Sequence, residues 1–95
     1  MEVNHAWESN ESYHNLLAWS WHYAAETKIV IVNYSPNPAQ GRLKVPLPEA
    51  NIGRMLFLDE LTGTTYARDP DEVSTQGLYI ALEPYHAHLL DMTTD

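Results

Sequence analysis

The segment from Lys28 to Tyr34 constrains the fold more than any other part of the sequence. Four β-branched residues follow one another from Ile29 to Val32, and such side chains favour the extended backbone of a strand. A helix fits poorly, because Ser35-Pro36-Asn37-Pro38 ends the run after a few residues and proline disfavours helical backbone in the residue before it. We therefore expect a β-strand over residues 28–34.

Shorter strand signals recur along the rest of the chain, at residues 14–21, 42–47, 55–59, 64–68, 78–82 and 86–92. The residues between them are typical of turns. Leu61-Thr62-Gly63-Thr64 indicates a hairpin turn, since glycine adopts positive φ without steric cost, and Asp69-Pro70-Asp71 indicates the start of a loop. Pro46 donates no backbone hydrogen bond, so its strand is expected to lie at a sheet edge or to end there.

The spacing of these signals predicts the fold class. Turn signals about every eight to twelve residues, between about seven or eight short strands, are typical of an antiparallel sandwich or barrel. No window has the pattern of an amphipathic helix of about ten residues or more. We predict an all-β fold, a small antiparallel β-sandwich of Greek-key type.

The length of 95 residues corresponds to one domain. Residues 1–13 are rich in Asn, Glu and Ser, and we interpret them as an irregular lead-in from an upstream domain that this chain lacks. Residues 14–95 are then expected to form the single β-sandwich domain.

Two expected strands carry large apolar side chains on both faces. Alternation places Leu17, Trp19 and Trp21 on one face of the first strand, and residues 16, 18 and 20 on the other. The segment 28–34 also lacks alternation. One interpretation is a central strand whose outer face is apolar and exposed to solvent, which is common. The other is an outer face covered by another domain, with Leu17, Trp19 and Trp21 as the candidate interface residues.

Charge and composition exclude several kinds of partner. The formal net charge is −8, with only 5 Lys and Arg residues, so the cationic footprint of a nucleic-acid-binding protein is missing. Anionic membranes would repel such a surface as well. The absence of cysteine favours the cytoplasm over secretion, and the acidic, polar start predicts no signal peptide. The negative charge does not exclude neutral partners such as sugars.

The histidines raise the question of a metal site. His86 and His88 are two residues apart, which would place both on one strand face, where neutral imidazoles can chelate zinc. No third ligand follows at a recognisable spacing. We therefore predict no metal and no cofactor, and interpret the two histidines as hydrogen-bonded structural residues.

Catalysis on a glycoside requires two carboxyl groups that face each other across a cleft. The candidate carboxylates all lie in expected turns or at strand ends, where such groups are usually solvated or hold the turn. They are Asp59, Glu60, Asp69, Asp71 and Glu72. No nucleophile elbow and no glycine-rich phosphate loop is present. We predict no catalytic residues in this chain.

Aromatic side chains offer a different activity, because their flat apolar faces can stack on sugar rings. Trp19 and Trp21 lie within an expected strand, where packing in a core or at a domain interface is the commoner use. Trp7 and Tyr85 lie in expected loops. They are therefore the candidate carbohydrate-binding residues.

Several motifs resemble, in order and spacing, the C-terminal β-domain of bacterial α-amylase-family glycoside hydrolases. The similarity covers roughly residues 14–92. Its first three parts are an opening strand (14–21), a strand ending in Asn-x-Ser (29–35) and the strand after it (40–43). A Leu-Thr-Gly hairpin (58–66) and a closing pair of strands around a proline–aromatic corner (77–90) follow. Tyr85 departs from the pattern, since tryptophan is expected there.

The resemblance implies a non-catalytic accessory domain of an α-glucan-acting glycoside hydrolase. In that family the catalytic residues lie on a (β/α)₈ barrel of about 250 residues, and none of them can be assigned here. The implied partner is this barrel in the same polypeptide, with α-glucan as a further partner in some members. Two alternatives stay open: a starch- or glycogen-binding module, and a free-standing sandwich that mediates protein contacts.

Overall fold

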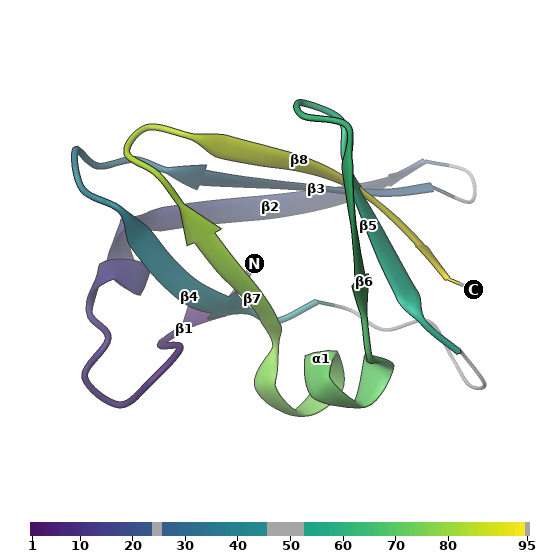
Figure 1. Cartoon of the computed structure of the whole chain (residues 1–95), viewed down its shortest axis with the longest axis horizontal. Coiled ribbons are helices and arrows are strands. Elements are labelled where there is room, and N and C mark those ends of the chain that lie inside the picture. Colours follow the sequence, from purple (N-terminus) through teal and green to yellow (C-terminus); the bar gives the residue numbers. More distant parts are fainter. Residues whose placement is uncertain (24–25, 46–52, 95) are drawn as a thin grey trace.

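A computed structural model describes residues 1–23, 26–45 and 53–94 of the chain. Two antiparallel sheets pack together, one of three strands in the order β1-β4-β7 and one of five in the order β2-β3-β8-β5-β6 (Figure 1). The predicted small β-sandwich is confirmed. The strands are β1 (Val3–Asn4), β2 (Leu16–Tyr23), β3 (Glu26–Asn33), β4 (Ala39–Leu43), β5 (Met55–Asp59), β6 (Thr64–Arg68), β7 (Leu78–Leu82) and β8 (Ala87–Thr94).

The core lies between the sheets and is made by alternate residues of the strands. In β3, Ile29 and Ile31 are fully buried, while Val30 and Val32 face outward and are half-buried. Register continues this pattern, because Ile29 pairs with Leu90 of β8. Within the described part of the chain, the buried hydrophobic residues are Leu16, Ile29, Ile31, Ala39, Leu43, Val45, Met55, Phe57, Val73, Leu78, Ile80, Leu82, Leu90 and Met92.

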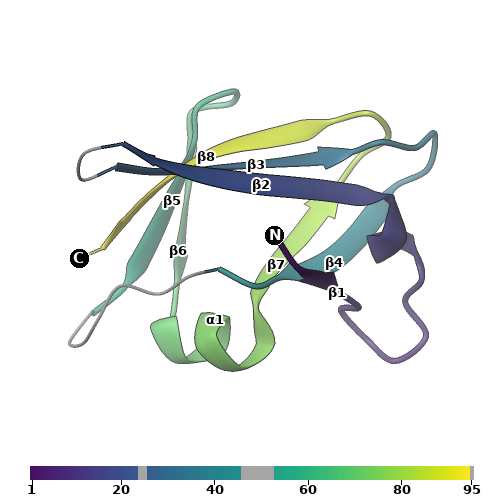
Figure 2. The same cartoon turned by 180° about the vertical axis from the view of Figure 1, so that it is seen from behind.

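The five-stranded sheet is assembled from two hairpins and one late strand. β2 pairs with β3, β5 pairs with β6, and β8 lies between the hairpins, paired with both β3 and β5. Figures 1 and 2 show the strong twist that results: β5 and β6 run steeply across the direction of β2 and β3. The chain passes from one sheet to the other after β1, β3, β4, β6 and β7.

The first residues are more ordered than the sequence analysis expects. Val3 and Asn4 pair with Leu43 and Arg42 of β4, so the lead-in expected over 1–13 contains one short paired strand. A short 3₁₀ helix, η1 (Ser12–Asn15), follows. This segment closes one corner of the sandwich: the Met1 amino group donates to the carbonyl of Ala18, 3.2 Å away.

A helix replaces the loop expected after Arg68. α1 (Pro70–Gln76) begins after Asp69, whose carboxylate accepts a hydrogen bond from the backbone N–H of Asp71. Proline in the first turn and a carboxylate cap are both start signals for helices. The Asp-Pro pair also occurs in turns, so the sequence at this point is compatible with a loop as well. Gly77 ends the helix with φ of 86°.

No helix of the described residues is long and apolar enough to cross a membrane.

Strand bounds differ in two further places. β4 covers Ala39–Leu43 and begins three residues earlier than expected. It lies between β1 and β7, so it is not an edge strand, but it ends before Pro46, as the other alternative expects. Pro46 and Leu47 are outside the described residues. The strand expected from residue 14 begins at Leu16, because η1 occupies the positions before it.

Candidate functional site

The outer face of β2 carries the largest apolar side chains that remain exposed on a strand. Leu17, Trp19 and Trp21 are 53%, 49% and 44% exposed. Their inward neighbours differ, since Leu16 is buried and Ala18 is packed against the core. The predicted division of this strand into two faces is therefore confirmed, and the sandwich leaves the tryptophan-bearing face uncovered.

The apolar surface continues across the neighbouring strands. Leu17 pairs with Val32 and Trp19 pairs with Val30, and Val30 in turn pairs with Leu89 of β8. All three of these partners are half-buried. We call this surface the β2 face: Leu17, Trp19, Trp21, Val30, Val32 and Leu89.

Charged groups border the β2 face at one end. Trp21 pairs with Lys28, whose Nζ lies 3.2 Å from Glu60 and 3.4 Å from Asp91. Partial burial lowers the pKa of Lys28, but its hydrogen bonds to the two carboxylates outweigh this effect and raise the pKa above the ordinary value. The ammonium therefore stays charged, and the apolar surface ends in a fixed ion cluster.

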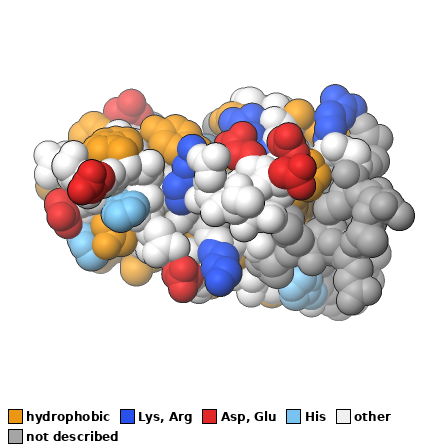
Figure 3. All heavy atoms as spheres, turned by 90° about the horizontal axis from the view of Figure 1, so that it is seen from below, with side chains coloured by type: hydrophobic (Ala, Val, Ile, Leu, Met, Phe, Trp, Pro, Cys, Tyr) orange, Lys and Arg blue, Asp and Glu red, His pale blue; other side chains and the backbone are white. Residues whose placement is uncertain are grey.

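The other side of the molecule has a different character. Figure 3 shows the view from below, on the side of α1 and β1, where acidic and basic side chains lie among polar groups and hydrophobic side chains gather toward the left end. Arg42 and Glu72 form an ion pair here at 3.1 Å. This side resembles an ordinary solvated surface.

The two candidate carbohydrate-binding residues lie on separate loops. Trp7, 47% exposed, precedes η1, and Tyr85, 66% exposed, lies in the turn between β7 and β8. Tyr85 has φ of 58°, the only non-glycine residue with positive φ among those described. No contact joins the two rings in the described part of the chain, so the structure does not assemble them into one platform.

Buried Asn33 holds the turn that carries Tyr85. Its side-chain amide donates to the carbonyls of Asn37, Leu82 and Glu83, at 2.7, 3.2 and 3.1 Å. The backbone N–H of Tyr85 donates to the carbonyl of Ser35. These bonds tie the β3–β4 and β7–β8 turns together, which accounts for a tyrosine being retained in a left-handed conformation.

The histidine pair does not act as one unit. His88 lies on the inner face of β8, with its Nδ1 2.7 Å from Oδ2 of Asp59, whereas His86 precedes β8 and is exposed. Among residues 1–23, 26–45 and 53–94, no three His, Cys, Asp or Glu side chains are grouped to hold a metal ion.

Asp59 is fully buried, which differs from the solvated position expected for a turn carboxylate. Burial raises its pKa, but hydrogen bonds from His88 and from the backbone N–H groups of Leu61 and Leu89 outweigh burial and lower the pKa below the ordinary value. The bond to Leu61 also holds the β5–β6 turn, as the alternative role for turn carboxylates predicts. Asp59 is therefore an ionised structural residue.

The remaining candidate carboxylates are also engaged in the fold or placed at its surface. Glu60 binds Lys28, Asp69 caps α1 and Glu72 binds Arg42. Asp71 lies exposed in the first turn of α1, where a negative charge favours the helix dipole.

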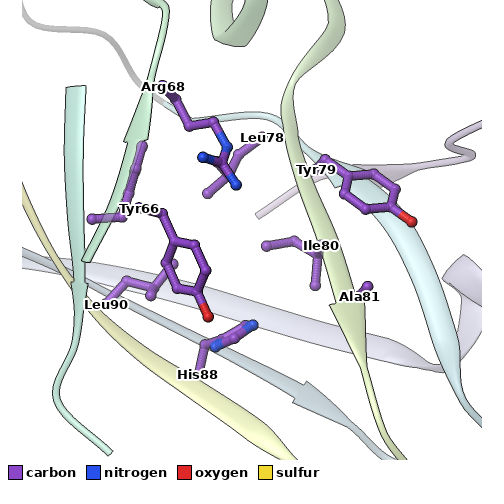
Figure 4. A pocket seen from close by; sticks show the side chains of 9 residues that line it. Tyr66, Arg68, Leu78, Tyr79, Ile80, Ala81, His88 and Leu90 are labelled. Carbon is purple, nitrogen blue, oxygen red and sulfur yellow. The ribbon is translucent and has the colours of Figure 1, made fainter. Parts of the chain in front are cut away.

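A pocket that the sequence analysis did not anticipate opens at the other corner of the sandwich, between β6 and β7 (Figure 4). Its volume is about 200 Å³. We call it the corner pocket; it is lined by Phe57, Tyr66, Arg68, Leu78, Tyr79, Ile80, Ala81, His88 and Leu90. No local motif marks it, because its walls come from four different strands, β5 to β8.

Comparisons of the sequence with protein-family models and with curated proteins found no match.

Proposed function

We propose that this chain is a non-catalytic accessory domain that packs, through the β2 face, on the catalytic (β/α)₈ barrel of an α-glucan-acting glycoside hydrolase. The observation that carries the proposal is the exposure of Leu17, Trp19 and Trp21 along one strand. The resemblance of residues 14–92 to the C-terminal β-domain of α-amylase-family enzymes supplies the kind of partner.

The physical argument concerns what a free domain would leave in water. Monomeric proteins seldom expose continuous apolar patches of more than a few hundred Å², and tryptophan is enriched at protein interfaces. Two tryptophans on one face, next to half-buried valines of β3, fit a surface that a second domain covers. Interfaces between domains of one chain commonly bury about 600–1,500 Å².

The path of the chain is compatible with this arrangement. The Met1 amino group donates to the carbonyl of Ala18 in β2. A domain joined to the N-terminal side of this residue would therefore begin beside the strand that carries Trp19 and Trp21, within reach of the β2 face.

The domain is proposed to contribute no chemistry of its own. Asp59, Glu60, Asp69 and Glu72 all serve hydrogen bonds or ion pairs of the sandwich. Purified chain should accordingly give no turnover above buffer with starch, maltotriose or a chromogenic α-glucoside. Turnover that one carboxylate substitution abolishes would contradict this part of the proposal.

The test of docking uses the coding sequence upstream of Met1 and a binding assay. The proposal expects a barrel there, and the barrel and this chain, expressed as separate polypeptides, should co-purify. The variant Trp19→Thr/Trp21→Thr should lose the barrel while keeping its own fold, because both side chains point away from the core.

A matched control is the variant Leu61→Thr/Tyr79→Thr, whose side chains are 61% and 39% exposed in the β5–β6 turn and on β7 of the other sheet. It should bind the barrel as the parent does. The proposal fails if no barrel is encoded with this domain, or if both double variants bind equally well.

A second candidate function is α-glucan binding, and the exposure of Trp7 and Tyr85 is the observation that favours it. Titration with maltooligosaccharides and soluble starch tests it by tryptophan fluorescence and calorimetry. A glucan-binding module would be supported if the parent binds these sugars and if Trp7→Ala or Tyr85→Ala weakens the binding. Titrations of the parent that release or absorb no heat of binding would oppose it.

A further inference from the structure

The corner pocket exists because the two sheets differ in width. The three-stranded sheet ends at β7, whereas the five-stranded sheet extends to β6. The inner face of β6 therefore overhangs its cover, and Tyr66 and Arg68 are only half-buried although they point to the core side. At the opposite corner, β1 and η1 pack against β4 and β2.

The floor of the pocket is apolar. Phe57 and Leu90 contribute it from the five-stranded sheet, and Leu78 and Ile80 contribute it from β7. A volume of about 200 Å³ is enough for a six-membered aromatic ring, since a dry cavity of about 150 Å³ accepts benzene. The floor thus favours a flat apolar ring.

Polar groups stand at the two ends of this floor. In Figure 4 the guanidinium of Arg68 points into the space between β6 and β7, at one end of the pocket, and the imidazole of His88 lies at the other end, beneath the hydroxyl of Tyr66. The ring of Tyr79 points away, to the far side of β7. The pocket is therefore cationic at one end and has an imidazole at the other.

Arg68 is the cation of the corner pocket, and it is available to receive an anion from outside. Lys28 and Arg42 are both bound to carboxylates. Arg68 donates to the carbonyl of Ala67 at 2.8 Å and lies over the ring of Tyr66 at 5.5 Å, and it has no ion pair with a carboxylate of the described residues. A guanidinium can bind a carboxylate through two parallel hydrogen bonds.

His88 is held with one nitrogen turned to the pocket. Its Nδ1 is 2.7 Å from Asp59, a carboxylate whose other oxygen accepts from the backbone N–H groups of Leu61 and Leu89. An ionised carboxylate can only accept, so Nδ1 carries the proton and a neutral ring has a lone pair on Nε2. Nε2 has no hydrogen bond to any described residue, and it would accept one from a hydroxyl group.

We propose that the corner pocket binds a small aromatic hydroxy acid. Its ring lies on the floor, its carboxylate binds Arg68, and its hydroxyl donates to Nε2 of His88. This site is separate from the β2 face, and the proposal does not depend on the proposed domain function.

The experiment is a titration of isotope-labelled protein, followed by amide chemical shifts, with 4-hydroxybenzoate as the probe. Saturable shifts are expected at residues of β6, β7 and β8 that line the pocket. Two analogues test the two ends on the unchanged protein: 4-hydroxybenzamide lacks the charge and benzoate lacks the hydroxyl. Loss of the charged contact should weaken binding about tenfold, and loss of the hydroxyl should weaken it several-fold.

A matched pair of variants separates the local contact from overall charge. Arg68→Gln and Lys44→Gln remove one positive charge each, and Lys44 is exposed outside the pocket. Arg68→Gln should weaken the probe about tenfold, and Lys44→Gln should leave its affinity nearly unchanged.

Several results would overturn the proposal. They are equal affinity for the acid and the amide, equal loss in both variants, or shifts confined to the β2 face. Glucuronate serves as a polar ring acid, and tighter binding of glucuronate than of 4-hydroxybenzoate would contradict the role of the apolar floor.

Discussion

The two faces of the five-stranded sheet are similar in sequence and different in environment. β3 places Ile29 and Ile31 on one face and Val30 and Val32 on the other, yet only the isoleucines are fully buried. A sandwich consumes one face of each sheet, so the second apolar face is available for another surface. The comparison shows that hydrophobicity along a strand does not by itself distinguish core from interface.

Truncation of adjacent residues of β3 to alanine is expected to show the largest difference in stability between the two faces. Ile31→Ala should lower the free energy of unfolding by about 2–4 kcal/mol, because it removes buried methylenes and leaves a cavity. Val32→Ala, one residue away on the outer face, should cost about 1 kcal/mol or less. Urea unfolding of both variants measures the difference, and equal losses would mean that the outer face is as well packed as the core.

Two glycines allow a second comparison, between a position with crowded surroundings and a position with open surroundings. A Cβ at Gly41 would meet Tyr13 Cβ at 3.0 Å, with Leu16 and Val3 at 3.1 Å, so Gly41→Ala should cost about 1–3 kcal/mol by overpacking. Gly63 has φ of 79° and open space around it, so Gly63→Ala should cost only about 1 kcal/mol for the left-handed backbone.

Sequence alone predicts the reverse order for these two glycines, because the hairpin at Gly63 is visible in the sequence and the crowding at Gly41 is not. Thermal melting of the two alanine variants decides the order. A larger loss of stability at Gly63 would show that the N-terminal segment can move away from β4.

Asp59 is a buried polar residue on the inner face of the five-stranded sheet, and its substitution tests how much this residue contributes to stability. Asp59→Asn keeps an acceptor for Leu61 and Leu89 but loses the bond to the protonated Nδ1 of His88, so it should cost about 1–3 kcal/mol at neutral pH. The pKa of Asp59 is lower in the folded chain than in the unfolded chain, so the unfolded state binds more protons and stability rises with pH.

The pH dependence follows from this sign. The contribution of Asp59 is fully present above its unfolded pKa of about 4 and is lost as the pH falls through the lower folded pKa. Urea unfolding from pH 7 to pH 2 should show a steeper decline for the parent than for Asp59→Asn. Parallel curves would mean that Asp59 is not ionised in the native state.

The smallest effect on stability is expected on the β2 face. Trp19→Thr keeps a residue that favours strands and removes one cross-strand contact with Val30, so it should cost about 0.5–1 kcal/mol. Thermal melting measures this, and a loss as large as that of Ile31→Ala would show that Trp19 supports the sandwich itself rather than an interface.

Much of the fold could be predicted from the sequence because it depends on local patterns. Alternation in 78–82, the β-branched run of β3 and the glycine turn at Gly63 each specify structure within a few residues. The two faces of β2 followed from the same alternation. α1 was missed because Asp-Pro is shared by helix starts and turns, and a helix of seven residues carries little periodicity.

The corner pocket and the Asp59–His88 contact could not be predicted in the same way. Asp59 and His88 lie on different strands, β5 and β8, which become neighbours only because β8 inserts between the two hairpins. The pocket depends on the unequal widths of the sheets, which is a property of the whole topology. Long-range pairing, rather than residue type, decides both features.

The central position of β8 also has a consequence for how the chain acquires its structure. Among the described strands, β8 is synthesised last, and it is the strand that joins the β2–β3 hairpin to the β5–β6 hairpin. During translation the nascent chain can therefore form separate hairpins but not the complete sheet, and isolated hairpins are marginal in water. We expect the cooperative folding step to wait until residues 87–94 have left the exit tunnel, and to be slow for a domain of this size, since contacts between distant segments dominate it.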